Sequence, residues 1–191
     1  DHFDIAGRMT ARLIELGHRR IGFIAGDPAS KGGTERLRGH LRAMALAGIP
    51  EAPVEQGYFT FQSGLEATER ILQSFSKCSA LIACNDDMAA AAISVAHRHH
   101  LNVPDDLTVV GFDDTPIASI VSPAITTARQ PIAEMAQSAI RMLHAAAIAG
   151  DADDSKRTQK VLPCTLIERE SSAAPRQHPL LEAPANSAAS A

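Results

Sequence analysis

The sequence predicts an α/β fold with a doubly wound parallel sheet, and three observations support this. Short apolar runs of the kind that form buried strands alternate with longer stretches whose apolar residues recur at helical spacing. One run, residues 80–84, is apolar throughout, as expected of a strand that is buried on both faces. The connections are short, which favours right-handed crossovers between parallel strands.

The helices are predicted from their apolar spacing and their boundary residues. In the first, over residues 5–16, Asp4 is the candidate cap and Gly17 ends the helix. A second begins near Thr34 and stops at Gly48, and a third follows a turn at residues 58–60. An alanine-rich helix over 88–98 is capped by Asn85-Asp86, residues 117–121 form a helical turn, and a long helix spans 131–147 with proline in its first turn.

The predicted strands lie between these helices, at residues 21–25, 54–57, 80–84, 108–111, 125–129 and 161–167. We interpret residues 150–158 as a charged loop. From Ser171 onward alanine, proline and serine dominate without periodicity. We therefore expect one domain over residues 1–170 and a disordered tail over residues 171–191.

Composition excludes several classes of protein. The net charge of −4 offers no basic surface that would bind nucleic acid non-specifically. The 3 cysteines are odd in number and widely spaced, which fits neither a zinc site nor a disulfide framework and favours reduced thiols in the cytoplasm. No apolar run approaches the roughly 18 residues of a membrane span. The chain begins with Asp1 rather than with a signal peptide or an initiator methionine, so we expect a piece of a longer protein.

Five polar or aromatic residues follow different predicted strands or open the next helix: Arg36, Phe59, Asn85, Asp113 and Gln130. In open α/β sheets ligands bind beyond the carboxyl ends of the strands, so we expect these residues to share one rim. A carboxylate such as Asp113 accepts hydrogen bonds from two neighbouring hydroxyls, an arginine donates, and an aromatic ring stacks on an apolar sugar face. Together they predict a site for a neutral polyol.

Other chemistry has weaker support in the sequence. Each of these residues could instead be a cap, a turn residue or an ion-pair partner, and Asn85 in particular is a normal helix cap. The run of histidines at residues 97–100 does not place three imidazoles on one helix face, so we expect no metal and no cofactor. Asp113 and Asp114 are adjacent and point to opposite sides, so they are not expected to act as an acid–base pair. No serine or cysteine nucleophile motif predicts an enzyme.

Six stretches carry a resemblance to a known family and occur in the same order as in that family: Leu-Gly-His-Arg-Arg-Ile at 16–21, Arg-x-x-Gly at 36–39, Ala-Cys-Asn-Asp-Asp-Met-Ala at 83–89, the run from Val-Pro-Asp-Asp-Leu-Thr to Gly-Phe-Asp-Asp at 103–114, Pro-Ala-Ile-Thr-Thr at 123–127, and Leu-Pro at 162–163 with Ile-Glu-Arg at 167–169. In these stretches the chain resembles the ligand-binding core of the LacI/GalR family of transcriptional repressors. The resemblance covers roughly residues 1–170.

The resemblance implies a periplasmic binding protein-like fold, mainly its second subdomain, with the DNA-binding headpiece and most of the first subdomain absent. It also implies a set of ligand residues: Arg36, Phe59, Asn85, Asp113 and Gln130. Gly32 departs from the family, since some relatives carry a ligand-contacting hydroxyl there. The expected partners are a small sugar-like effector, operator DNA through the missing headpiece, and a second copy that would pack against residues 88–96 and 115–121.

Two other functions remain open at this point. A periplasmic sugar-binding protein for transport shares the architecture, and an α/β enzyme acting on a sugar is a further alternative. The cysteines and the quoted motifs favour the regulator. A helix-turn-helix or a secretory signal upstream of Asp1 would discriminate between the first two, and turnover of a bound sugar would indicate the third.

Overall fold

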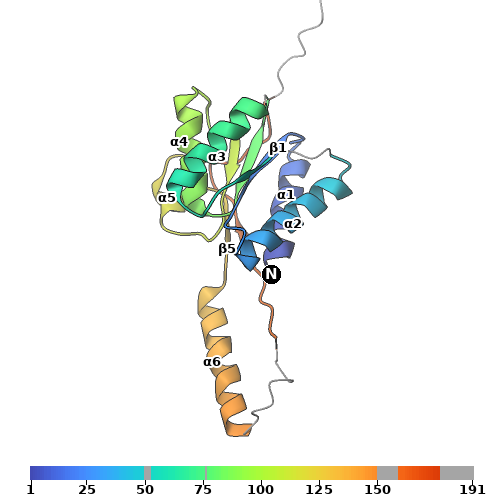
Figure 1. The fold of residues 1–191 in the computed structure, drawn as a ribbon, viewed down its shortest axis with the longest axis vertical. Helices are drawn as coiled ribbons and strands as arrows, with labels where there is room; N and C mark the ends of the chain where they lie inside the picture. The colour runs from blue at the N-terminus through green and yellow to red at the C-terminus, as the bar shows by residue number, and fades with distance from the viewer. Residues whose placement is uncertain (50–52, 76, 150–158, 177–191) are drawn as a thin grey trace, which may run out of the picture.

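The computed structural model describes residues 1–49, 53–75, 77–149 and 159–176 of the chain, so the charged loop predicted at 150–158 lies outside the described residues. Helices and strands alternate, as the sequence predicted (Figure 1). The helices are α1 (His2–Glu15), α2 (Lys31–Leu46), α3 (Phe61–Ser74), α4 (Asp86–Arg98), α5 (Ile117–Ile120) and α6 (Ile132–Ala149). The strands are β1 (Ile21–Ala25), β2 (Val54–Gln56), β3 (Ala80–Ala83), β4 (Thr108–Val110), β5 (Thr127–Arg129) and β6 (Thr165–Ile167).

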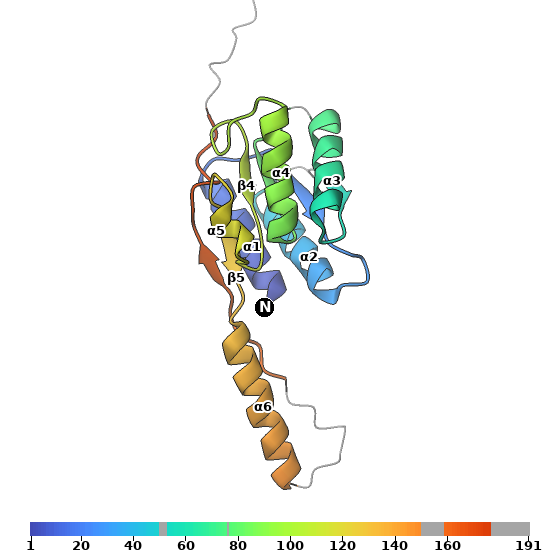
Figure 2. The ribbon, with the colours of Figure 1, turned by 90° about the vertical axis from the view of Figure 1, so that its left-hand side faces the viewer.

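The main sheet has four parallel strands in the order β2-β1-β3-β4. Helices α1 and α2 lie on one side of it, and α3 and α4 lie on the other (Figures 1 and 2). Every residue of β1 and β3 is buried, because these two strands are central and covered on both faces. The prediction of a doubly wound parallel sheet is therefore confirmed for this part of the chain.

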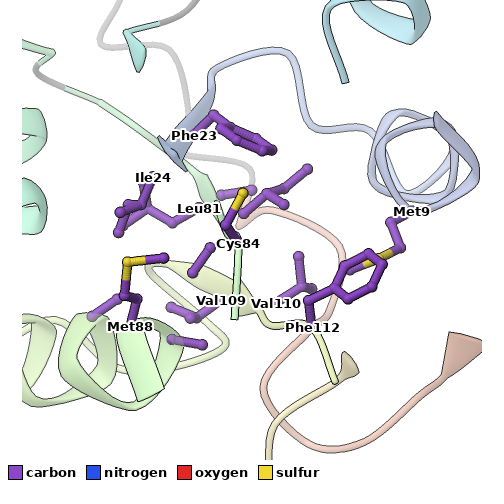
Figure 3. Close-up of a cluster of buried hydrophobic side chains, with 14 of the residues drawn as sticks. Met9, Phe23, Ile24, Leu81, Cys84, Met88, Val109, Val110 and Phe112 are labelled. Carbon is purple, nitrogen blue, oxygen red and sulfur yellow. The ribbon is translucent and has the colours of Figure 1, made fainter. Parts of the chain in front are cut away.

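The core fills both sides of the sheet. Figure 3 shows Met9 of α1 and Met88 of α4 on either side of strand residues that include Leu81 and Val109. Phe23 and Phe112 are among the largest fully buried side chains. Small residues bring α3 and α4 close together, and a β-carbon at Gly64 would lie 2.7 Å from the α-carbon of Met88.

Two helix starts differ slightly from the prediction. The cap of α1 is Asp1 rather than Asp4, since the Asp1 side chain accepts a hydrogen bond from the amide of Asp4 (2.9 Å). The cap of α2 is Ser30, which accepts from the amide of Gly33 (3.2 Å). Gly17 ends α1 as expected, with a positive φ of 106° that glycine adopts without strain.

The last two strands depart from the all-parallel expectation. β5 and β6 form a separate antiparallel pair, and an isolated parallel bridge joins Thr126, just before β5, to Val110 of β4. The strand predicted over residues 161–167 is shorter, because only Thr165–Ile167 has a paired neighbour. These two strands are the connections to α6 (Figure 2).

Helix α6 stands clear of the main sheet and the helices that cover it (Figures 1 and 2). Its large apolar side chains are mostly exposed; Leu143 and Ile148 are 72% and 74% exposed. Exposed apolar surface of this extent is typical of interaction surfaces. No helix among the described residues is long and apolar enough to cross a membrane.

The prediction that disorder begins at residue 171 is wrong for residues 171–176. Ser171 is fully buried; its carbonyl accepts from the amide of Val109 (2.9 Å), and its amide donates to the carbonyl of Ala124 (3.0 Å). His18 donates from Nε2 to the carbonyl of Ala173 (2.8 Å). These residues belong to the folded domain, and the rest of the predicted tail, 177–191, lies outside the described residues.

One predicted association surface is also not available. Residues 88–96 of α4 are nearly all buried within the same chain, because α3, α5 and the sheet pack around this helix. Side chains that are buried within their own chain have no surface left for contact with a second copy. The neighbouring segment at residues 115–121 retains exposed apolar surface, since Ile120 is 78% exposed.

Candidate functional site

Arg36 is the centre of the candidate site. It lies on α2, and its guanidinium sits over the ring of Phe112, 3.6 Å from the ring centre. Nη2 donates to Oδ1 of Asp113 (3.1 Å), Nη1 donates to the carbonyl of Cys84, and Nε donates to Nδ1 of His2 (3.3 Å). The side chain is therefore held by the ends of two strands, the first turn of α1 and an aromatic ring.

Asp113 follows β4 in a turn with unusual backbone geometry. Asp113 and Asp114 have positive φ angles of 104° and 54°, which non-glycine residues seldom adopt and which commonly occur at functional sites. Gln130 at the end of β5 donates from Nε2 to the same Oδ1 that Arg36 contacts (2.6 Å). No described residue donates to Oδ2, so this oxygen is available to a ligand.

The second carboxylate of the turn points elsewhere, as predicted. Asp114 accepts hydrogen bonds from Arg129 (2.5 Å) and Arg169 (2.6 Å), and its side chain is only 9% exposed. Burial alone would raise the pKa of Asp114, but the hydrogen bonds from Arg169 and Arg129 outweigh it and lower the pKa below its ordinary value. Asp114 thus ties the turn to β5 and to the residues after β6.

Asp86, at the start of α4, fixes the turn from the other side. Its carboxylate accepts from the hydroxyl of Thr127 (2.6 Å) and from the amide of Thr115 (2.7 Å). Burial raises the pKa of Asp86, and the hydrogen bonds from Thr127 and Thr115 oppose that rise. The acidic turn is therefore held on both sides by groups that do not face the site.

Phe59 and Asn85 form a second pair. Phe59 has a positive φ of 60°, and its ring lies against Gly26, where a β-carbon would collide with it. Asn85 caps α4, since Oδ1 accepts from the amide of Met88 (3.1 Å), and Nδ2 donates to the carbonyl of Phe59 (2.9 Å). The capping alternative for Asn85 is thus observed, and the residue also positions the aromatic turn.

The structure brings the five predicted residues into one neighbourhood. Arg36, Asp113 and Gln130 are directly hydrogen bonded, and the Phe59 ring contacts Gly33 on the same helix turn as Arg36. Their role in binding stays a prediction. Sequence reasoning missed His2, which lies before the first strand and had no motif to mark it. Among the described residues no group of histidine, cysteine, aspartate or glutamate has the arrangement of a metal site.

Residues 10–172 match the family of periplasmic binding protein-like domains. The chain is 37% identical over 177 residues to the HTH-type transcriptional regulator AscG of Escherichia coli, covering 92% of this chain and 52% of AscG. It is 38% identical over 164 residues to the HTH-type transcriptional regulator CelR of Thermobifida fusca, covering 85% of this chain and 47% of CelR. The chain therefore spans about half the length of these curated relatives.

Solved structures give the same result for the fold. The complex of the regulator CelR with cellobiose aligns with a TM-score of 0.84 at 35% identity, over 90% of this chain and 52% of that one. A sugar-binding regulator of the LacI family from Escherichia coli, complexed with phosphate, aligns with a TM-score of 0.82 at 36% identity, over 92% of this chain and 62% of that one. The relatives named here are transcriptional regulators, so the LacI-type resemblance is confirmed.

Proposed function

We propose that this chain, which belongs to the family of periplasmic binding protein-like domains, is the effector-binding part of a LacI-type transcriptional regulator that responds to a sugar-like metabolite. The sugar class is supported by the CelR complex with cellobiose and by the 32% identity to the ribose operon repressor of Haemophilus influenzae. In this proposal Arg36, Phe59, Asn85, Asp113 and Gln130 bind the effector. The relatives are regulators rather than enzymes, and the proposed role is binding without turnover.

One observation carries the proposal: the Asp113 carboxylate is oriented through Oδ1 only. Arg36 and Gln130 both donate to that oxygen, which leaves Oδ2 for hydroxyl donors. A charged acceptor with a fixed orientation suits two neighbouring hydroxyls of a sugar. Phe59, held in a left-handed conformation over Gly26, supplies an aromatic surface for the apolar side of a pyranose or furanose.

The exposed helix α6 supports a further element of the proposal, that a first subdomain completes the site. β5 leads into the helix, and most of its large apolar side chains are exposed among the described residues. We infer that a second body of protein packs on α6 and closes over Asp113. A headpiece attached to that body would bind operator DNA, and a second copy of the protein would pack near Ile120, in the cytoplasm.

The test is calorimetry on the protein in the full length that its gene encodes, with cellobiose, ribose and related mono- and disaccharides. Asp113→Asn should weaken binding of the best sugar by at least roughly tenfold, because charge-assisted hydrogen bonds contribute about 1.5–3 kcal/mol each. Asp105→Asn is the matched control, since Asp105 is exposed and paired with Arg176 away from the site. Wild-type affinity in Asp113→Asn and in Arg36→Lys would refute the site.

The regulatory half of the proposal needs a second measurement. The sugar that binds should change the affinity of the full-length protein for its own promoter DNA in a gel-shift titration. If the sugar and the DNA prefer different conformational states, the sugar must change the affinity of the protein for DNA. DNA must then change the affinity for the sugar by the same factor. A protein that binds sugar tightly yet shows the same DNA affinity with and without it would be a carrier rather than a regulator.

A further inference from the structure

His2 is placed beside the predicted ligand residues without having been one of them. It opens α1, and its ring lies 5.8 Å from the ring of Phe112, centre to centre. Its Nδ1 atom accepts a hydrogen bond from Nε of Arg36 (3.3 Å). The same guanidinium donates to Asp113, so one arginine holds a carboxylate on one side and an imidazole on the other.

The contact with Arg36 determines which nitrogen of His2 carries the proton. A guanidinium has only donors, so Nδ1 must be the acceptor and its lone pair must be free. A neutral imidazole with an unprotonated Nδ1 has its hydrogen on Nε2. Burial and the charge of Arg36 both lower the pKa of His2 below its ordinary value, so the ring is neutral at pH 7.

The Nε2 edge of this ring has no protein partner: no described residue accepts a hydrogen bond from Nε2, and the side chain is only partly buried. Gly32, in the first turn of α2, lies against the face of the ring instead. A β-carbon there would lie 3.6 Å from Cε1 and only 3.2 Å from Nε2 and 3.3 Å from Cδ2, and the last two distances are closer than side chains ordinarily approach. Glycine therefore lets the ring pack against α2 while the Nε2–H bond points away from that contact. The result is an oriented donor without a protein acceptor.

We propose that His2 is a further effector-binding residue, which donates Nε2–H to a hydroxyl or ring oxygen of the sugar. The proposal rests on the sugar-binding function proposed above. It adds a donor to a site in which Oδ2 of Asp113 is proposed as an acceptor. A ligand that fits both has an oxygen acceptor near one end and hydroxyl donors near the other, as neutral sugars do and amines do not.

The position of the proton can be measured without a ligand. Nitrogen-15 NMR of the full-length protein, with His2 assigned by its absence from the His2→Phe variant, should show Nε2–H at pH 7. Addition of the sugar that binds best in the calorimetric panel, starting with cellobiose, should shift the His2 signals. A proton on Nδ1, or no shift on saturation with that sugar, would overturn the proposal.

Binding measurements then separate the donor from the ring. His2→Phe keeps an aromatic ring without the donor and should weaken sugar binding roughly fivefold, as expected for the loss of one neutral hydrogen bond of about 1 kcal/mol. His2→Gln restores a donor and should recover most of the affinity. His99→Phe, at an exposed histidine paired with Glu69, is the control and should bind like the wild type.

Gly32 gives a second test, of the position of the ring. Gly32→Ser places a β-carbon against the face of the His2 ring and should displace it, so sugar binding should weaken. In a His2→Ala background the same change meets no ring and should have little further effect. An equal loss in both backgrounds would contradict the idea that Gly32 acts through the His2 ring.

The affinity should also respond to pH through His2. The charged side chains that face its ring are Arg36 and Glu35 from α2 and Asp113 from the acidic turn. Protonation puts a hydrogen on Nδ1 against the guanidinium, so affinity should fall on acidification. Because the pKa of His2 is lowered, the fall should come only at a pH below the ordinary histidine range. His2→Phe should lack this fall; a fall of the same size in His2→Phe would assign it to another group.

The outcomes distinguish this inference from the function on which it rests. If no sugar of the panel binds the wild type, both are refuted. If the wild type binds and Asp113→Asn is weakened while His2→Phe is not, the sugar site stands and the role of His2 is refuted.

Discussion

Acidification should destabilise the protein through His40, a buried residue that takes no part in the proposed site. Its ring is 1% exposed and stacks on Phe23, with the ring centres 4.9 Å apart. Thr10 donates its hydroxyl hydrogen to the carbonyl of Ala6 (2.8 Å), so Nδ1 of His40 must donate to the Thr10 oxygen (3.0 Å). Nε2 is then an acceptor, and no described atom donates to it.

The magnitude follows from linkage between protonation and folding. Burial lowers the pKa of His40 from its ordinary value of 6.5 to about 4. Because the folded pKa is the lower one, the unfolded chain binds the proton first. The neutral ring's contribution is therefore complete above pH 6.5 and is lost as the pH falls toward 4. At pH 4.5 the loss amounts to about 2.5 kcal/mol, a large part of the stability of an ordinary domain.

The assay is urea unfolding at pH 7.5, 6.5, 5.5 and 4.5. His40→Asn removes the titrating ring and keeps an amide donor near the Thr10 hydroxyl. This variant should be less stable than the wild type at pH 7.5, because it leaves a cavity beside Phe23. Its further loss on acidification should be smaller by about 2.5 kcal/mol at pH 4.5. His99→Asn, at an exposed histidine, controls for surface effects. Parallel losses in the wild type and His40→Asn would refute a buried neutral imidazole.

Three further outcomes are expected from the packing and the ion pairs. Truncation after residue 170 should destabilise the protein by several kcal/mol in urea unfolding, because it removes the buried hydrogen bonds of Ser171, whereas truncation after residue 176 should not. Gly64→Val should cost about 1–3 kcal/mol in thermal unfolding, since a β-carbon would press on Met88; an unchanged melting temperature would refute the close α3–α4 contact. Asp114→Asn keeps a residue that tolerates the left-handed backbone but removes the charge that pairs with Arg129 and Arg169. Sugar binding, measured by calorimetry, should weaken several-fold. Unchanged affinity would show that these ion pairs do not position Asp113.

The main sheet and its helices could be predicted from the sequence because their signals are local. The apolar run of β3 needs no knowledge of its neighbours to be identified as a buried strand. Gly17 and Asn85 mark helix ends through their own backbone and side-chain preferences, and both act as predicted. The ends of successive parallel strands meet at one edge of a sheet, which is why the five candidate residues could be grouped before any contact was known.

The features that escaped prediction depend on contacts between distant residues. Ser171 lies in a polar, proline-rich stretch with the composition of a tail, yet it fits beside Val109, 62 residues earlier in the chain. The alanines of α4 looked like small surface residues, but helix α3 covers them, and alanine is as suitable for close packing inside a domain as between two copies. The antiparallel pairing of β5 and β6 is set by the excursion to α6, which strand propensity does not encode.

The acidic turn provides a physical link from the proposed sugar site to helix α6. The amide of Asp113 donates to the carbonyl of Ala128 in β5 (2.9 Å), and Gln130, whose side chain contacts the Asp113 carboxylate, lies two residues before α6 begins. Asp114 adds ion pairs to Arg129 in β5 and to Arg169 just after β6. A sugar that pulls on Asp113 therefore acts on the base of α6 through contacts of at most 2.9 Å. If the sugar binds one orientation of α6 better than another, that difference in affinity is what shifts the population, and whatever protein packs on α6 moves with it.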